Sequence, residues 1–459
     1  MNASRLSSWF YRAETQVNQL LDRVDQWIDR EQHIVITGLS RSGKSMLFTA
    51  LIAQLNQRVA NDFDPLPLLT SIPRERIERV ELQTHFDGLA GFPFADNLIK
   101  LQQRQWPKAT DKISAFRLTL RLKHRNAVKQ KLLGSKKLSL FFYDYPGEWL
   151  MDLPLESLNY AQWSAQVFSQ LAGEPQASLA KTWLQSLRSF DFDQAPTEAA
   201  LNDYISLYQA YLLAAKAQGV SLLQPGALIL PPPGLVVGKM FAPLPNKVLS
   251  DGTHPWTQAM TAQYQQFIEQ WVSPFKQRFF NQADKQVILI DVLEGLSFGR
   301  AYLDEMKEAM NHLSQSFIYG KRRWFQRLGI KPRISQVGFV ATKMDLIPLA
   351  ERERLKTLLS HMTEGVRHHL SQEQVEFEHF LIASLLSAKP EQNAVCYKDS
   401  QGQSLRQTFE PIPTRLADFP DQEFYPRIQA LPPKMQSVDD WQSLGLDELM
   451  DYFLKGALK

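Results

Sequence analysis

The sequence has few of the features that mark secreted or membrane-embedded proteins. It contains one cysteine in 459 residues, which excludes an internal disulfide framework. It has no run of about 18 apolar residues that could span a bilayer, and its first residues lack the apolar segment of a secretory signal peptide. The net charge is only +3, so the composition does not favour nucleic acid as a partner. These absences predict a cytoplasmic protein with no nucleic-acid partner.

The strongest motif that is present lies at residues 38–45 and reads GLSRSGKS, which matches the phosphate-binding pattern GxxxxGKS. The β-branched run at 33–37 predicts a buried strand before it, and the run at 46–55, which lacks Gly and Pro, predicts a helix after it. Backbone N–H groups and the helix N-terminus would then face phosphate groups. The predicted nucleotide-binding residues here are Ser40, Arg41, Ser42, Gly43, Lys44, Ser45 and Met46. Among them, Lys44 would reach the β- and γ-phosphates and Ser45 would bind Mg²⁺.

A second motif follows an apolar strand predicted at 138–143. Residues 144–148 read DYPGE, which places Asp144 at the carboxyl end of that strand. A carboxylate in this position beside a P-loop can contact Mg²⁺ through water. Gly147 would offer its N–H to a γ-phosphate, so the motif predicts the second half of a triphosphate site.

A threonine that binds Mg²⁺ and the γ-phosphate should precede the hairpin that leads into this motif. The alternation of apolar and polar residues at 116–122 predicts the first strand of that hairpin. Thr110 lies just before it and is the preferred candidate, as a metal ligand together with Ser45 and Asp144. Thr84 is a weaker candidate.

A third motif points to the base. After a strand predicted at 337–341 come Thr342, Lys343 and Asp345, in the pattern TKxD. An ionised Asp345 can accept hydrogen bonds from guanine N1–H and N2–H₂, whereas adenine would leave the carboxylate unpaired. Lys343 would lie over the base, and the Thr342 hydroxyl would tie the P-loop. For a base-contacting serine we prefer Ser384, at the end of the next strand, although residues 387–389 (SAK) resemble the more familiar triplet.

The alternation of strands and helices is interrupted in the middle of the chain. Helical patterns dominate there, at 163–171, 181–190, 199–217 and 256–271. The α/β pattern resumes with a strand at 287–293, helices at 300–317 and 350–371, a strand at 378–384 and a closing helix at 444–454, after a looser segment at 386–438; another helix is predicted at 10–30. We therefore predict an α/β P-loop NTPase fold with a mixed, mostly parallel sheet. Its two parts would be 1–149 and 284–459, with a helical insertion at 150–283.

These motifs together make the chain resemble the YcjX family of bacterial P-loop proteins. The resemblance rests on GLSRSGKS, DYPGEWL, SLLQPG, VILIDVLEGL and TKMD, in that order along nearly the whole chain. It implies a fold similar to Ras-like GTPases with a helical insertion, GTP or GDP and Mg²⁺ as ligands, and slow GTP hydrolysis. It also implies a stress-linked role, a small inner-membrane protein as partner, and hence a location at the periphery of the inner membrane.

The sequence departs from small GTPases at Glu148, where they place a glutamine that orients the attacking water. A carboxylate there can orient water but brings negative charge toward a γ-phosphate, so we predict slow turnover. An arginine from the helical insertion, from a partner, or Arg41 itself could raise the rate. The predicted catalytic residues are Lys44, Thr110, Gly147 and Glu148. Two alternatives remain open, namely a nucleotide-gated scaffold at the membrane that does not hydrolyse, and an ATPase or kinase, which Asp345 disfavours.

Overall fold

The computed structural model describes residues 29–39, 41–85, 88–124, 131, 134–320, 334–420 and 425–455. The predicted phosphate-binding Ser40 lies outside these residues, and so does the helix predicted at 10–30, apart from its last two positions. Those two positions, Asp29 and Arg30, instead begin strand β1. Within the described ranges, no helix is long and apolar enough to cross a bilayer.

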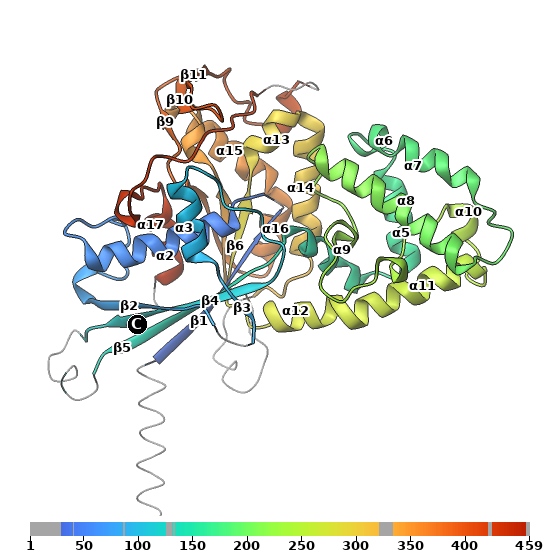
Figure 1. The fold of residues 1–459 in the computed structure, drawn as a ribbon, viewed down its shortest axis with the longest axis horizontal. Coiled ribbons are helices and arrows are strands. Elements are labelled where there is room, and N and C mark those ends of the chain that lie inside the picture. The colour runs from blue at the N-terminus through green and yellow to red at the C-terminus, as the bar shows by residue number, and fades with distance from the viewer. Residues whose placement is uncertain are drawn as a thin grey trace, which may run out of the picture.

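A central sheet organises the molecule (Figure 1). Its strand order is β2-β4-β5-β1-β6-β7-β8, and the short strand β3 also pairs with β4. The pairs from β5 through β1, β6 and β7 to β8 are parallel, whereas β2–β4 and β4–β5 are antiparallel. The strands are β1 Asp29–Gly38, β2 Ile77–Gln83, β3 Ala90–Gly91, β4 Ser114–Leu122, β5 Lys136–Asp144, β6 Lys285–Ile290, β7 Gln336–Ala341 and β8 Glu376–Leu381.

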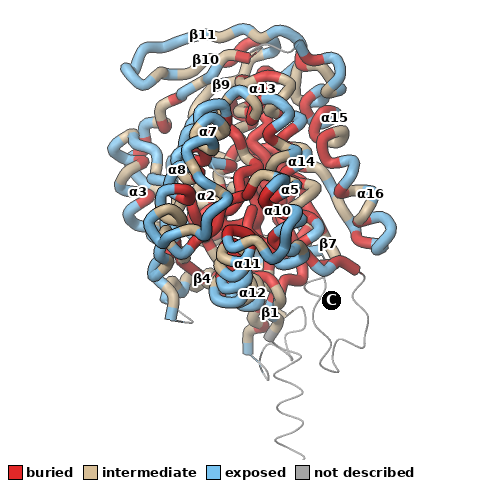
Figure 2. The backbone as a smooth tube through the Cα atoms, turned by 90° about the vertical axis from the view of Figure 1, so that its right-hand side faces the viewer, coloured by how far each residue is buried: buried red, intermediate tan, exposed pale blue. Residues whose placement is uncertain are grey.

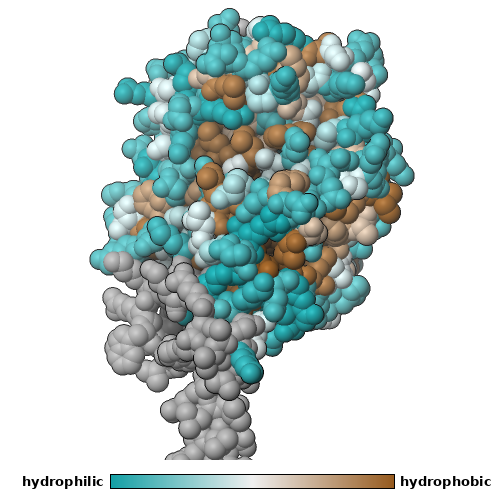
Figure 3. Space-filling view, turned by 90° about the vertical axis from the view of Figure 1, so that its left-hand side faces the viewer, coloured by the Kyte–Doolittle hydropathy of each residue, from teal (hydrophilic) through white to brown (hydrophobic). Residues whose placement is uncertain are grey.

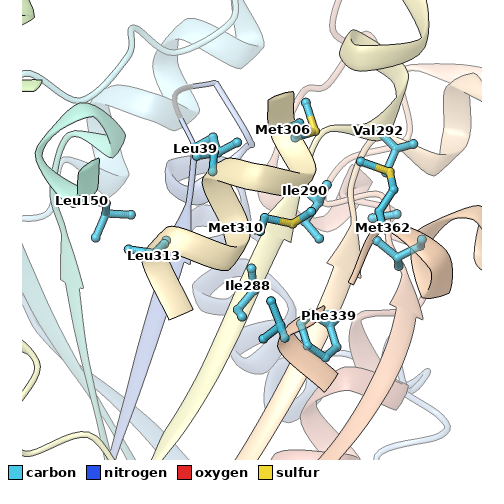
Figure 4. Close-up of a cluster of buried hydrophobic side chains, with 14 of the residues drawn as sticks. Leu39, Leu150, Ile288, Ile290, Val292, Met306, Met310, Leu313, Phe339 and Met362 are labelled. Atoms are coloured by element: carbon cyan, nitrogen blue, oxygen red, sulfur yellow. The ribbon is translucent and has the colours of Figure 1, made fainter. Parts of the chain in front are cut away.

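Helices cover both faces of this sheet. Successive residues of β6 point to opposite sides, as the period of a strand requires. Ile288 and Ile290 join the core under α13 to α16, whereas Val287 and Leu289 join the core under α2 and α17. Figure 4 shows the first of these cores, where Met306, Met310 and Leu313 of α14 lie over the sheet. These helices are α2 Lys44–Ala60, α3 Phe94–Gln102, α13 Val292–Phe298, α14 Arg300–Ser314, α15 Arg352–Met362, α16 Glu364–Gln372 and α17 Leu446–Leu454.

The helices between β5 and β6 form a third core of their own. It contains buried aromatic residues such as Trp163, Tyr204 and Trp256. These helices lie to one side of the sheet in Figure 1, and Figure 2 shows buried segments within that group as well as in the centre of the molecule. They are α5 Tyr160–Gln170, α6 Gln176–Leu179, α7 Lys181–Ser186, α8 Glu198–Ala217, α9 Gly226–Ile229, α10 Asn246–Leu249 and α11 Pro255–Phe267. The last helix before β6, α12 Ser273–Phe279, instead packs Phe275 and Phe279 into the core under α13 to α16. The boundaries that we place at 149/150 and 283/284 stay predictions.

Several predicted elements have other bounds in the structure, among them the strand at 378–384, which ends at Leu381, and the helix at 300–317, which ends at Ser314. Two further cases have a clear physical reason. The strand predicted at 287–293 is too long, because the Asp291 side chain accepts a hydrogen bond of 3.1 Å from the Glu294 backbone N–H and caps helix α13. The helix predicted at 350–371 is two helices, α15 and α16. They meet at Thr363, whose hydroxyl donates to the Leu359 carbonyl at 2.9 Å.

The segment at 386–438 is more structured than the sequence predicts. It contains a three-stranded antiparallel sheet of β9 Ala388–Pro390, β10 Ala394–Lys398 and β11 Ser404–Thr408. The edge strand β2 was not predicted either, because its charged residues hide the alternation of a strand. Seen from the left-hand side of Figure 1, the surface is mainly hydrophilic and hydrophobic residues gather in small areas (Figure 3). The α/β architecture with a mainly parallel sheet confirms the predicted fold class.

A buried carboxyl group joins the 3₁₀ helix at Gly147–Ser157 to the helical insertion. Asp152 accepts hydrogen bonds from the backbone N–H groups of Gly226, at 2.6 Å, and Ala227, at 3.0 Å. Burial raises the pKa of Asp152 from 3.8 to about 8 although both hydrogen bonds lower it. The folded state therefore binds more protons than the unfolded state between these two values, so this group makes the protein less stable as the pH rises through that window.

We predict that the Asp152→Asn substitution destabilises the protein at the low end of this pH range and does not destabilise it at the high end. At pH 5 the variant should be less stable by about 1 kcal/mol, because the amide can accept only one of the two hydrogen bonds. At pH 8 it should equal or exceed the wild type, since the cost of a buried charge is removed. Urea unfolding at pH 5, 6, 7 and 8 measures this. Glu305, with a pKa raised to about 7, contributes with the same sign and should leave a residual slope. Parallel profiles for the two proteins would contradict the prediction.

Candidate nucleotide-binding site

The P-loop lies between β1 and α2, as its sequence predicts. Gly43 precedes helix α2 with φ +91°, a conformation that side chains disfavour. Lys44 is buried, and its Nζ donates to the Gly38 carbonyl at 2.9 Å. Burial lowers the pKa of Lys44, and the carboxylates of Asp144 and Glu148 oppose that shift. A buried cation thus faces the position where phosphate would lie.

The three predicted metal ligands come from three separate segments and meet in one place. Ser45 Oγ donates to Asp144 Oδ2 at 2.8 Å, and Thr110 Oγ1 donates to the same oxygen at 2.8 Å. The two hydroxyl oxygens are 2.7 Å apart. Burial raises the pKa of Asp144, whereas Lys44 and the two hydroxyl groups lower it.

The second carboxylate oxygen of Asp144 indicates what this cluster can bind. Oδ1 is buried and has no hydrogen-bond partner among the described residues. A buried unpaired acceptor is costly, and water on a bound cation would satisfy it. The described residues contain no cluster of three or more His, Cys, Asp or Glu that could hold a metal ion alone. Hydroxyl oxygens, one carboxylate and added phosphate oxygens suit Mg²⁺, which keeps several of its waters.

The predicted base-recognition residues lie beyond the end of β7. Asp345 is 2% exposed, and the Ser387 N–H and hydroxyl both donate to its Oδ2 at 2.7 Å. Burial raises the pKa of Asp345, and these hydrogen bonds oppose the shift. Lys343 forms an ion pair with Asp291. The Thr342 hydroxyl has no partner among the described residues, so within that part of the chain the predicted tie to the P-loop is not formed.

One cavity of about 610 Å³ joins the phosphate and base ends. This size suits a small-molecule site. Among the predicted site residues, those that line it are Arg41, Ser42, Gly43, Lys44, Ser45, Met46, Thr110, Gly147, Glu148, Thr342, Lys343, Asp345 and Ser384. Asp144 does not line the cavity and instead contacts the two hydroxyl groups that do. The predicted residues that the structure describes are therefore brought together from five separate segments.

The candidate serines and threonines differ in their contacts, although which of them would contact a nucleotide or a metal stays a prediction. Ser384 lines the cavity, but Ser387 is the serine that hydrogen-bonds Asp345, in the SAK triplet that we ranked second. The Ser384 carbonyl instead accepts a hydrogen bond of 2.8 Å from the Trp441 indole. Thr84 is not among the residues that line the cavity, and its hydroxyl contacts the neighbouring His85 ring.

Sequence reasoning missed one wall of the cavity. Residues 428–431, which follow the small sheet β9–β11, line the cavity but belong to no motif that the sequence analysis recognised. The Trp106 indole N–H donates to the Ala430 carbonyl at 2.8 Å, and Arg104 Nε donates to the Pro432 carbonyl at 3.2 Å. These bonds attach the segment that carries Thr110 to a part of the chain more than 300 positions away. No pattern in the sequence marks residues 428–431 as part of the site. Asp291, by contrast, directly follows a buried strand, so the sequence could have marked it as a candidate site residue.

The helical insertion also contributes a residue beside the site. Lys216, near the end of α8, forms an ion pair with Glu148. Among the residues that the structure describes, the insertion side chain that pairs with Glu148 is this lysine and not an arginine. The source of an activating arginine, whether the insertion, a partner or Arg41, stays a prediction.

Comparison with known proteins agrees with this geometry. A family model described as the YcjX-like family, DUF463, matches residues 33–458. The chain belongs to the YcjX-like family. It is 30% identical over 381 residues to a protein of Escherichia coli K12 named "Ras-like GTPase YcjX", an alignment that covers 80% of this chain and 81% of the relative. It is 27% identical over 480 aligned positions to a protein of the same name from Shewanella oneidensis MR-1, which covers 97% and 98%.

Membership in the YcjX-like family confirms the resemblance that the motif order predicted. The fold agrees with it, since the mixed α/β architecture with a mainly parallel sheet is consistent with a Ras-like P-loop GTPase. The matched region includes the P-loop, the DYPGE motif, the helical insertion and the TKMD motif. The family model therefore spans all the motifs from which the site was predicted.

Proposed function

We propose that this protein binds GTP and GDP with Mg²⁺ and hydrolyses GTP slowly, as a nucleotide-dependent switch. The observation that carries the proposal is that one cavity joins Asp345 to the cluster of Ser45, Thr110 and Asp144. The names of the relatives support it. A stress-linked role and a small inner-membrane protein partner rest on the family resemblance alone, and they remain part of the proposal.

The residues at the two ends of the cavity have distinct roles in this scheme. Lys44 and the backbone N–H groups of the loop stabilise charge on the β- and γ-phosphates. Ser45 and Thr110 would hold Mg²⁺ directly, and Asp144 would hold it through water. When bound, the ion neutralises developing negative charge on the phosphates. Asp345 accepts from the guanine N1–H and N2–H₂ groups, and Ser387 holds its carboxylate in place.

The switch itself would depend on two segments that line the phosphate end. In the triphosphate state Thr110 and Gly147 contact the terminal phosphate, which orders the residues at about 105–113 and 145–155. Loss of that phosphate removes both contacts. Because Asp152 and Glu148 connect the second segment to the helical insertion, a change there would reach the insertion directly.

Competition between GDP, GTP and ATP for the purified protein with Mg²⁺ tests the proposal. We expect guanine nucleotides to bind at least about thirtyfold, or 2 kcal/mol, more tightly than ATP, because adenine leaves the buried Asp345 carboxylate unpaired. Fluorescent GDP displaced by each nucleotide gives the three affinities. Equal competition by ATP would reduce the proposal to a P-loop protein of unknown base, which is the ATPase alternative.

A nucleotide-gated scaffold that does not hydrolyse GTP is the second candidate, and the place of Glu148 at the phosphate end of the cavity favours it. A carboxylate at this end of the cavity brings negative charge toward a γ-phosphate, which would slow hydrolysis. Single-turnover incubation with GTP and Mg²⁺ distinguishes the two. Phosphate release within about an hour, the timescale of an unassisted GTPase, supports hydrolysis. Its absence supports the scaffold.

A further inference from the structure

The helical insertion contacts the phosphate end of the cavity through one charged side chain. Lys216 Nζ donates to Glu148 Oε1, and the two side chains are 29% and 9% exposed. Both residues line a small pocket of about 50 Å³ that Arg41, Ser42 and Gly147 also line. Glu148 lines the large nucleotide cavity as well. It therefore stands between the P-loop and the insertion.

The backbone of Glu148 is held by the insertion too. A Cβ atom on Gly226 would lie 1.9 Å from the Glu148 carbonyl oxygen, so only glycine permits this approach. The next residues are tied in the same way, because Trp149 Nε1 donates to the Leu230 carbonyl at 2.7 Å. Glu148 is thus fixed at both its side chain and its main chain, which limits where its carboxylate can point.

The charge of Glu148 needs compensation when a triphosphate is present. Its carboxylate lines the same cavity as Lys44 and Ser45, so a γ-phosphate would approach a like charge. Like charges in a partly desolvated site repel strongly. Lys44 is buried in the loop and would serve the phosphates, whereas Lys216 comes from outside the loop and is paired with the carboxylate itself.

We propose that Lys216 is a positioning residue that neutralises and orients Glu148, so that the site accepts the triphosphate and Glu148 can orient the attacking water. This inference rests on the proposed function and adds to it a residue from the insertion. If Lys216 has this role, the preference for GTP over GDP depends on the docking of helix α8 beside Glu148. Lys216 acts here through Glu148 and not by touching the nucleotide.

The test is a double-mutant cycle on the full-length chain, with wild type, Lys216→Met, Lys216→Arg, Glu148→Gln and the Met/Gln double variant. Lys216→Met should lower the ratio of GTP to GDP affinity about tenfold, with GDP affinity unchanged, because loss of the lysine charge increases the repulsion between Glu148 and the γ-phosphate alone. Lys216→Arg should keep most of the wild-type ratio of GTP to GDP affinity. In the Glu148→Gln background, Lys216→Met should leave the ratio of GTP to GDP affinity almost unchanged. Lys181→Ala, an exposed lysine of the insertion, is the control and should match the wild type.

Each alternative outcome has a distinct meaning. An unchanged ratio in Lys216→Met overturns the inference, and an equal loss in the Glu148→Gln background shows that the lysine acts on the phosphate directly, which also overturns it. GDP affinity reports on folding, and Lys216→Arg keeps the test valid if the methionine variant misfolds. If the wild type prefers ATP to GTP, the proposed function fails, and the same ratio measured with ATP and ADP still decides the role of Lys216. If the wild type binds no nucleotide, both fail.

Discussion

Replacement of Lys44 by alanine is expected to reduce single-turnover GTP hydrolysis by roughly 10²–10³-fold, the typical cost of removing one preorganised group that stabilises the transition state. The ammonium group is buried, and it is already aimed along the P-loop by its hydrogen bond to the Gly38 carbonyl. Little reorganisation is then needed when phosphate charge develops. Radiolabelled GTP with excess protein, followed to completion, measures the rate of the chemical step.

Two further variants make this result specific. Lys44→Arg keeps the charge but not its compact shape, so it should recover binding better than hydrolysis. Lys181→Ala removes a lysine from an exposed position of the insertion and should leave the rate unchanged. If the Lys44→Ala protein hydrolyses GTP within about threefold of the wild-type rate, far short of the expected loss, Lys44 has no part in the mechanism.

The second large effect is expected at the base. Asp345→Ala should weaken GTP binding at least about thirtyfold, or 2 kcal/mol, because two hydrogen bonds from guanine to a buried carboxylate are lost. ATP binding should change little, so the preference for guanine should largely disappear. Displacement of labelled GDP or ADP gives both affinities.

Inosine triphosphate makes this experiment sharper, since its base keeps N1–H and lacks the N2 amino group. The wild type should bind it more weakly than GTP by about tenfold, the value of one charge-assisted hydrogen bond. Asp345→Ala should bind the two equally. Ser387→Ala is a matched control, because it removes one hydrogen bond to the Asp345 carboxylate and keeps the carboxylate itself. It should therefore weaken GTP binding less than Asp345→Ala does. If Asp345→Ala still discriminates GTP from inosine triphosphate, another group recognises the amino group.

Sequence reasoning predicted those parts of the fold and site that depend on neighbouring residues. The P-loop, the strand before Asp144 and the strand before Asp345 are local patterns, and the structure has them where they were expected. Thr110 was found because its motif has a fixed place relative to a hairpin, and it does contact Ser45 and Asp144.

The errors arise where distant contacts decide the outcome. Val292 and Leu293 look like the end of a strand, but the Asp291 cap begins a helix there. Ser384 is closer to its strand end than Ser387, yet the turn after β8 brings Ser387 to Asp345. The pairing of Lys216 with Glu148 joins positions 68 residues apart, and no periodicity reveals it. The base-recognition and insertion contacts are therefore the part that only a structure supplies.

The position of β1 has a consequence for how the chain folds during synthesis. The ribosome makes β1 among the first described elements, yet its two neighbours are β5 and β6, and the β6 pairing joins Ile34 to Lys285. The P-loop that follows β1 therefore leaves the exit tunnel long before the sheet around it can close. Contacts of such long range form slowly and leave apolar strand surface exposed meanwhile. A nucleotide can make its full set of contacts only after residues 428–431 have been synthesised, because they also line the cavity. Nucleotide binding therefore cannot protect the P-loop and its strand during the earlier part of synthesis.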